Sequence, residues 1–116
     1  MSAKKNWSFR IEHILDAIGR IQQYASGLTK ETFSANQMAI DAVIRNFLII
    51  GEATRHIPAD VQAKHSEIPW PLMQGMRNVL VHDYEAVKLD VVWKTIQVSL
   101  PPLVEPLRNL LEECSK

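Results

Sequence analysis

Apolar residues recur at steps of three and four along most of the chain, the spacing that places side chains on one face of an α-helix. The first stripe runs from Ser8 to about Leu28 and comprises Ile11, Ile14, Leu15, Ile18, Ile21, Ala25 and Leu28. Gly27 lies near its end, where glycine often closes a helix. The pattern therefore predicts a long first helix over residues 8–28.

A second helix start is indicated by Ser34, which is followed three residues later by Gln37, as in a capping box. Phe33 and Met38 occupy the two positions of a hydrophobic staple. The stripe that follows comprises Ile40, Val43, Ile44, Phe47, Leu48, Ile50 and Gly51. We expect this helix to end before Pro58, because proline disfavours helical backbone at the preceding residue. A helix this apolar is expected at the centre of a bundle or beneath a second subunit.

The remaining chain predicts shorter helices. Residues 58–64 suit one short helix, and residues 65–71 read as a loop because two prolines fall within three residues. The next helix is expected over 71–81, with Gly75 allowing a close backbone approach. Asp90 is expected to cap a last helix, which Pro101 and Pro102 should kink before it continues through a run of leucines.

No alternating pattern typical of β-strands and no internal repeat is present in the 116 residues. The sequence therefore predicts an all-α fold, an antiparallel up-and-down four-helix bundle with one short extra helix. The length favours a single domain over residues 1–116.

Composition restricts the classes of function. The chain has 47% hydrophobic and 22% charged residues, typical of a globular protein, and its 13 basic and 13 acidic residues give no net charge. A broad basic surface for nucleic acid is therefore not expected, and contact with RNA would depend on a local cluster. Cys114 is the single cysteine, which favours a reducing compartment. With no signal peptide pattern and no apolar run long enough to cross a bilayer, we expect a cytoplasmic location.

The densest group of chemically useful residues lies between Arg77 and Tyr84 and includes Asn78 and His82. Arginine is a permanent cation whose forked donors suit phosphate, and histidine exchanges its proton near neutral pH. Together they favour phosphodiester chemistry. Each residue also has an ordinary structural explanation: a salt-bridging arginine, a histidine at a helix end and a packing tyrosine. Histidines and cysteine elsewhere lack the spacing of metal ligands, so no metal site is expected.

Helix geometry constrains how these residues can act together. At about 100° per residue, Arg77 and His82 would point roughly 140° apart on an unbroken helix, whereas Asn78 and His82 would be neighbours. For Arg77 and His82 to reach one phosphate, the helix must end by His82 or the site must lie between two subunits. The spacing favours a groove in a dimer.

The sequence resembles the HepT family, which are small toxins of the HEPN superfamily from prokaryotic toxin–antitoxin pairs. The likeness covers nearly the whole chain, and its most specific part is the Arg77, His82 and Tyr84 spacing with a polar residue directly after the arginine. Further matching segments are Ile49, Gly51-Glu52-Ala53, Ile68-Pro69-Trp70, Met76 to Tyr84 and Val92-Trp93.

The resemblance implies a homodimeric, metal-independent ribonuclease that needs no cofactor. Arg77 and His82 of both subunits would line a cleft at the dimer interface, with Asn78 as an accessory polar residue. In this expectation the ribose 2′-hydroxyl attacks the adjacent phosphorus, His82 acts as general acid or base, and Arg77 stabilises the charge on the phosphoryl oxygens.

The resemblance also implies a partner, a minimal nucleotidyltransferase antitoxin that attaches AMP to Tyr84. The added negative charge and bulk beside Arg77 and His82 would oppose RNA entry. The alternative function is a non-catalytic helical dimer that binds such a nucleotidyltransferase and recruits its substrate. The neutral net charge mildly favours this alternative, whereas the intact motif favours the nuclease.

Glu52 follows the most apolar part of the second predicted helix. It is expected either to pair with Arg77 or Arg45 and orient the site, or to be an exposed acid near a helix end.

Overall fold

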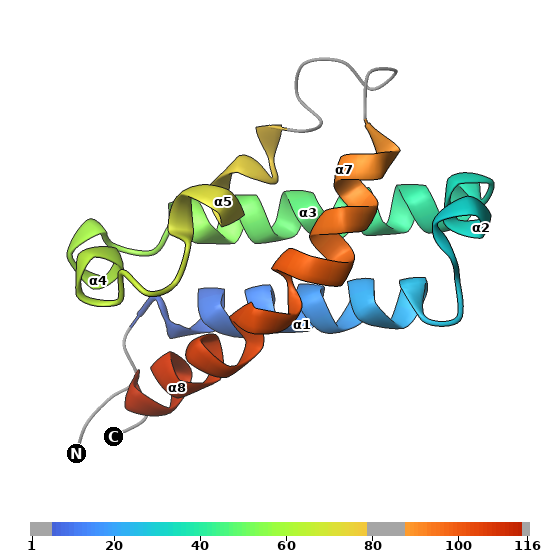
Figure 1. The fold of residues 1–116 in the computed structure, drawn as a ribbon. Helices are drawn as coiled ribbons and strands as arrows, with labels where there is room; N and C mark the ends of the chain where they lie inside the picture. Colours follow the sequence, from blue (N-terminus) through green and yellow to red (C-terminus); the bar gives the residue numbers. More distant parts are fainter. Residues whose placement is uncertain (1–5, 79–87, 115–116) are drawn as a thin grey trace.

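The computed structural model describes residues 6–78 and 88–114, and all regular elements within these ranges are helical (Figure 1). This confirms the all-α prediction. The helices before residue 79 are α1 (Ser8–Ala25), α2 (Lys30–Ser34), α3 (Gln37–Arg55), α4 (Ala59–Lys64) and α5 (Trp70–Gly75). After residue 87 follow α7 (Leu89–Lys94), the π-helical segment η2 (Thr95–Ser99), the 3-10 segment η3 (Pro101–Leu103) and α8 (Val104–Cys114).

The two long helices α1 and α3 run antiparallel and pack along their length (Figure 1). The apolar stripe of α1 is buried as predicted, since Ile11, Ile14 and Ile21 expose none of their surface. From α3, Val43 and Ile50 face them and are equally buried. Burial of these side chains supplies most of the driving force for pairing, at about 25 cal/mol per Å² of apolar surface.

The helical segments α7, η2, η3 and α8 follow one another without a loop, and together they form a bent helix that crosses α1 (Figure 1). The Leu100 N–H donates to the Thr95 carbonyl at 3.0 Å, five residues back, so the chain opens into a π turn before the prolines. Pro101 and Pro102 have no N–H to continue the helical bonding pattern, which explains the change of helix type. The predicted interruption at these prolines is confirmed.

The helix start expected at Ser34 is wrong, because a short helix, α2, ends at Ser34 and the long helix α3 begins only at Gln37. Thr29 caps α2, and its side chain and that of Thr32 form the capping box, so Ser34 is the last residue of α2. This single turn buries Phe33, whose ring lies 5.3 Å from that of Trp93.

The cap of α3 is Asn36, whose side-chain oxygen accepts a hydrogen bond from the Ala39 N–H at 3.0 Å. Met38 is 82% exposed, so the expected staple with Phe33 does not form. Asparagine is as good an N-cap as serine, and the placement of Phe33 in the core decides between the two positions.

Two further expectations need correction. The helix expected over 71–81 is interrupted, because α5 ends at Gly75 and Met76 and Arg77 lie in a turn. Asp90 is not the cap of α7, which is Lys88; instead, Asp90 lies in the first turn and its carboxylate is 2.9 Å from Lys30 Nζ. Within residues 6–78 and 88–114, no helix has the length and apolar character needed to span a membrane.

Candidate active site

Arg77 lies in the turn after α5, and its backbone packs directly against α3. Its N–H donates to the Gln74 carbonyl at 3.3 Å. A Cβ atom added to Gly51 would lie 2.6 Å from Arg77 Cβ and 2.8 Å from Arg77 N, closer than real Cβ contacts. Only glycine at position 51 therefore allows this approach. The close approach expected at Gly75 is not found within residues 6–78 and 88–114, because an added Cβ there meets none of their atoms within 4 Å.

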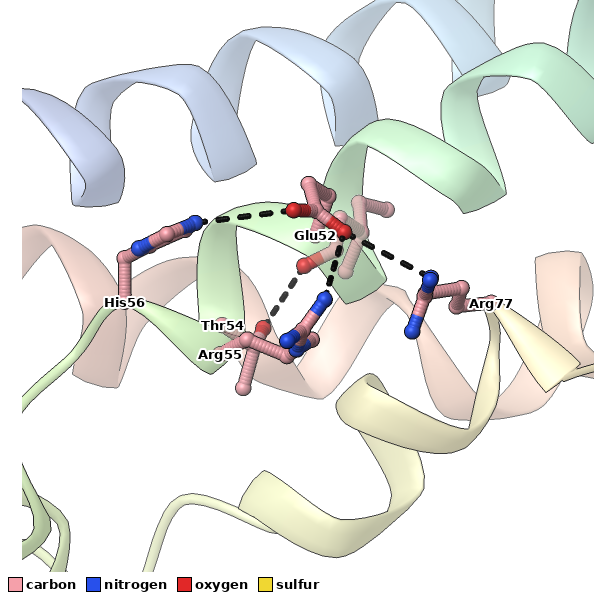
Figure 2. A network of polar contacts seen from close by, with 6 residues as sticks. Glu52, Thr54, Arg55, His56 and Arg77 are labelled. Atoms are coloured by element: carbon pink, nitrogen blue, oxygen red, sulfur yellow. Dashed lines mark hydrogen bonds and ion pairs between the residues drawn. The ribbon is translucent and has the colours of Figure 1, made fainter.

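The carboxylate of Glu52, one residue further along α3, joins three cationic or ionisable groups (Figure 2). Its Oε2 is 3.4 Å from Arg77 Nε and 3.3 Å from Arg55 Nη1. Its Oε1 is 3.5 Å from His56 Nε2. Helical spacing explains two of these contacts, because residues three and four positions after Glu52 lie on its face of α3. The third contact links α3 to the turn that carries Arg77.

These contacts affect the acidity of Glu52. Desolvation acts to raise the pKa of its carboxyl, but the charge of Arg55, the hydrogen bond with His56 and the charge of Arg77 outweigh it, so the pKa is lowered. Glu52 therefore carries its negative charge at neutral pH. One carboxylate between two guanidinium groups leaves a local charge of about +1.

The expected site residues fall into two groups. Arg77 and Asn78 lie within the described residues, and both line a hollow between the end of α3 and α5. His82 and Tyr84 fall in 79–87, outside the described residues. Glu52 forms the expected ion pair with Arg77. Its side chain is also about half exposed, so the alternative expectation of an exposed acid near a helix end holds in part.

Arg55 and His56 were missed by the sequence reasoning. A carboxylate followed at three and four residues by basic side chains on a helix is the pattern that could have revealed them. Arg45, considered as the other partner of Glu52, makes no ion pair with it among the described residues. In the same residues, no group of three or more histidine, cysteine, aspartate or glutamate side chains is placed to hold a metal ion.

The geometry leaves Arg77 able to bind an anion. Glu52 contacts Arg77 Nε, the guanidinium nitrogen nearest the main chain. The Arg77 side chain is 40% exposed. The two terminal nitrogens can then donate to a phosphate oxygen pair in the forked arrangement that arginine favours.

The chain is similar in sequence to proteins named as ribonucleases. The family model described as "Ribonuclease HepT-like" matches residues 14–110. A protein of Thermococcus cleftensis named "Probable ribonuclease HepT" is 38% identical over 100 residues, covering 86% of this chain and 91% of that protein. A protein of Caldanaerobacter subterraneus named "Putative RNase" is 32% identical over 103 residues, covering 89% of this chain and 92% of that protein.

A longer relative, from Methanocaldococcus jannaschii, is named "Gamma-glutamylcyclotransferase and putative RNase" and is 33% identical over 113 residues. This match covers 97% of the present chain but only 51% of the relative, so the chain spans about half of that protein's length. No solved structure matches the chain. The family match covers most of the chain, including Glu52 and the whole segment from Arg77 to Tyr84. The chain therefore belongs to the HepT-like family of ribonucleases.

Proposed function

We propose that this protein is the toxin of a toxin–antitoxin pair and a metal-independent RNA endonuclease that acts as a homodimer. Its fold would be the HEPN-like four-helix bundle, with Arg77, His82 and Asn78 in a cleft between subunits. The observation that carries the proposal is the fixed position of Arg77, which packs on Gly51 and is bound by Glu52 through Nε. The Arg77 side chain remains 40% exposed, so a phosphate can reach its guanidinium group.

The proposed reaction is an internal transesterification. The ribose 2′-oxygen bonds to the adjacent phosphorus, the bond from phosphorus to the 5′-oxygen breaks, and a 2′,3′-cyclic phosphate remains. His82 takes the proton of the 2′-hydroxyl while water protonates the leaving 5′-oxygen, or water accepts the first proton and His82 supplies the second; either role typically contributes about 10²–10⁴-fold in rate. Arg77 stabilises charge on the phosphoryl oxygens in the transition state, and Asn78 donates a further hydrogen bond.

A two-fold axis at the cleft would bring two copies of Arg77 and His82 together. This arrangement supplies the local positive charge that the whole chain, with 13 basic and 13 acidic residues, lacks. It also offers a way for Arg77 and His82 to meet, which their spacing would prevent on an unbroken helix.

The regulatory partner in this proposal is a cognate nucleotidyltransferase antitoxin that transfers AMP from ATP to the Tyr84 hydroxyl, releasing pyrophosphate. The new phosphodiester places a negative charge near Arg77 and His82 and competes with the RNA backbone. The reaction would take place in the cytoplasm. The expected readout is a gain of one AMP by mass on incubation with ATP and the antitoxin, and its absence from a Tyr84→Phe protein. If Tyr84→Phe is modified as well as the wild type, the acceptor is another residue.

The nuclease assignment is tested by incubating a labelled single-stranded RNA with the protein in excess EDTA. We expect cleavage with 2′,3′-cyclic phosphate ends, and a loss of at least 100-fold in rate for His82→Ala and Arg77→Ala. Arg108→Ala is the matched control, because Arg108 is an exposed arginine on α8. Cleavage by His82→Ala at the wild-type rate would refute the assignment, and a requirement for a divalent ion would refute the metal-independent mechanism.

A second candidate is a non-catalytic dimer that recruits substrate for the nucleotidyltransferase, and it is favoured by the neutral net charge. It predicts a stable complex with that enzyme, with no RNA cleavage by the wild type. The same RNA assay therefore separates the two candidates.

A further inference from the structure

A hollow on the surface between the end of α3 and α5 brings two arginines together. Arg55 reaches it from α3, and Arg77 from the turn after α5, while Pro71, Gln74, Gly75 and Asn78 complete its lining. Both arginines contact the same carboxylate oxygen, Glu52 Oε2, at 3.3 and 3.4 Å (Figure 2). Arg55 lies far from the Arg77–Tyr84 motif in sequence and has no role in the mechanism above.

We propose that this hollow is a binding subsite for a phosphodiester of the RNA backbone, in which Arg55 is a second phosphate-binding arginine. The inference rests on the proposed ribonuclease function and extends it by assigning residues outside the motif. Glu52 acts as the positioning residue, because its shared oxygen holds both guanidinium groups at the edge of the hollow.

Charge supports a monoanionic ligand. Two guanidinium groups and one carboxylate leave a net charge of about +1, which a single phosphodiester neutralises. Two arginines held near one carboxylate repel each other, and a bound anion relieves this repulsion. The charges of Arg55 and Arg77 and the hydrogen bond with His56 lower the pKa of Glu52, so its carboxylate is charged at neutral pH.

Shape and hydrogen-bonding capacity support the same ligand. Arg55 is bound to Glu52 through Nη1 and has a 44% exposed side chain, so its other nitrogens can donate into the hollow. Gln74 and Asn78 are exposed and add amide N–H donors. Gly75 also lines the hollow and has no side chain that would take up space in it. Arginines and side-chain amides are the groups that commonly contact nucleic-acid phosphates.

The direct test is RNA binding by the full chain in a His82→Ala background, which blocks cleavage in the proposed mechanism. The Kd for a fluorescently labelled single-stranded RNA is measured by anisotropy over a range of NaCl concentrations. We expect Arg55→Gln to weaken binding about tenfold and to reduce the slope of log K against log salt by about 0.7 to 1, the value for one phosphate contact. Arg55→Lys should retain the salt slope and part of the affinity, because it keeps the charge but not the fork.

The matched control is Arg108→Gln, which removes the same charge from α8. Equal weakening by Arg55→Gln and Arg108→Gln would show that only overall charge matters and would overturn the subsite. An unchanged Kd and salt slope for Arg55→Gln would overturn it as well.

A second variant does not depend on removing Arg55. Gln74→Glu places a negative charge in the hollow at an exposed position, so we expect weaker RNA binding with an unchanged thermal unfolding midpoint. Gln97→Glu, an exposed position on η2, is its control and should bind as the parent does. Wild-type affinity in Gln74→Glu would contradict a phosphate in this hollow.

Cleavage kinetics separate this inference from the proposed function. With His82 intact, Arg55→Gln should raise KM about tenfold and change kcat little, the pattern of an interaction made equally in the ground and transition states. If His82→Ala cleaves RNA as fast as the wild type, the proposed function fails. If His82→Ala is inactive and Arg55→Gln has wild-type KM, only the subsite fails.

Discussion

At the scale of single residues, the contact between Gly51 and Arg77 makes one added methyl group a sharp probe of the site. In Gly51→Ala the new Cβ would meet the Cβ and backbone nitrogen of Arg77, so the turn carrying Arg77 must shift. We expect a loss of about 1–3 kcal/mol in the free energy of unfolding, typical of overpacking, and a large fall in RNA cleavage. Chemical denaturation and the cleavage assay measure the two effects.

Gly19→Ala is the control for this substitution, because Gly19 lies within α1 and an added Cβ there meets no atom of the described residues within 4 Å. Replacing a helical glycine by alanine should stabilise the protein by about 0.5–1 kcal/mol and leave cleavage unchanged. If Gly51→Ala is as stable and active as Gly19→Ala, the backbone contact has no role in placing Arg77.

Glu52 gives the second residue-scale prediction, in the pH dependence of stability. Its pKa in the folded protein is lowered from 4.5, so its ion pairs stabilise the fold above that pH, and the stabilisation is lost as the pH falls through the lower folded value. The difference in thermal unfolding midpoint between wild type and Glu52→Gln should therefore be present near pH 6 and should shrink on acidification below 4.5. A difference that is constant down to low pH would contradict the ion-pair account.

At the scale of elements, the start of α3 separates the sequence interpretation from the observed fold. Asn36→Ala removes the side-chain acceptor for the Ala39 N–H and should cost about 1 kcal/mol of unfolding free energy. Ser34→Ala should cost much less, because Ser34 caps no helix and is exposed. Denaturation curves of the two variants compare them directly, and a larger effect at Ser34 would support the cap expected from sequence.

The sequence predicted the long helices well because the spacing of their apolar residues indicates which face of each helix is buried. The stripes of α1 and α3 identified both helices and their buried faces, and Pro58 and the two prolines at 101 and 102 marked real boundaries. The caps were harder, since Thr29, Ser34 and Asn36 are all competent and lie within one short stretch. Packing of Phe33 against Trp93 decides among them, and this contact spans too much of the chain to be read locally.

For the candidate site, too, contacts between residues distant in sequence could not be predicted from local patterns. Arg77, Asn78 and Glu52 were candidates from the sequence, and the pairing of Glu52 with Arg77, one of two expectations, is observed. Arg55 could have been found from helical spacing. The approach of Gly51 to Arg77 could not, because it depends on how α5 and its following turn settle on α3.

At the scale of the whole molecule, the proposed dimer predicts complementation between inactive variants. If one centre takes Arg77 from one subunit and His82 from the other, a heterodimer of Arg77→Ala and His82→Ala contains one fully wild-type centre. Co-refolding equal amounts should then restore roughly a quarter of wild-type cleavage, because half the dimers are mixed and each carries one of two centres. Light scattering measures the dimer mass in the same samples.

Each variant refolded alone serves as the control and should remain inactive. A dimer of the expected mass without recovered cleavage would place Arg77 and His82 of each centre in the same subunit. A monomer with full activity would contradict the interfacial cleft altogether.

The packing of Arg77 on Gly51 has a consequence for the thermodynamics of ligand binding. With its Cα and Cβ already held against α3, and its Nε already bound by Glu52, this arginine has few torsions left to freeze when an anion arrives. An unrestrained arginine would lose about 0.5–1.5 kcal/mol of conformational entropy on immobilisation. The packing on α3 moves part of that loss into folding, so loosening of the α3–Arg77 contact should weaken phosphate binding even when the terminal nitrogens are unchanged.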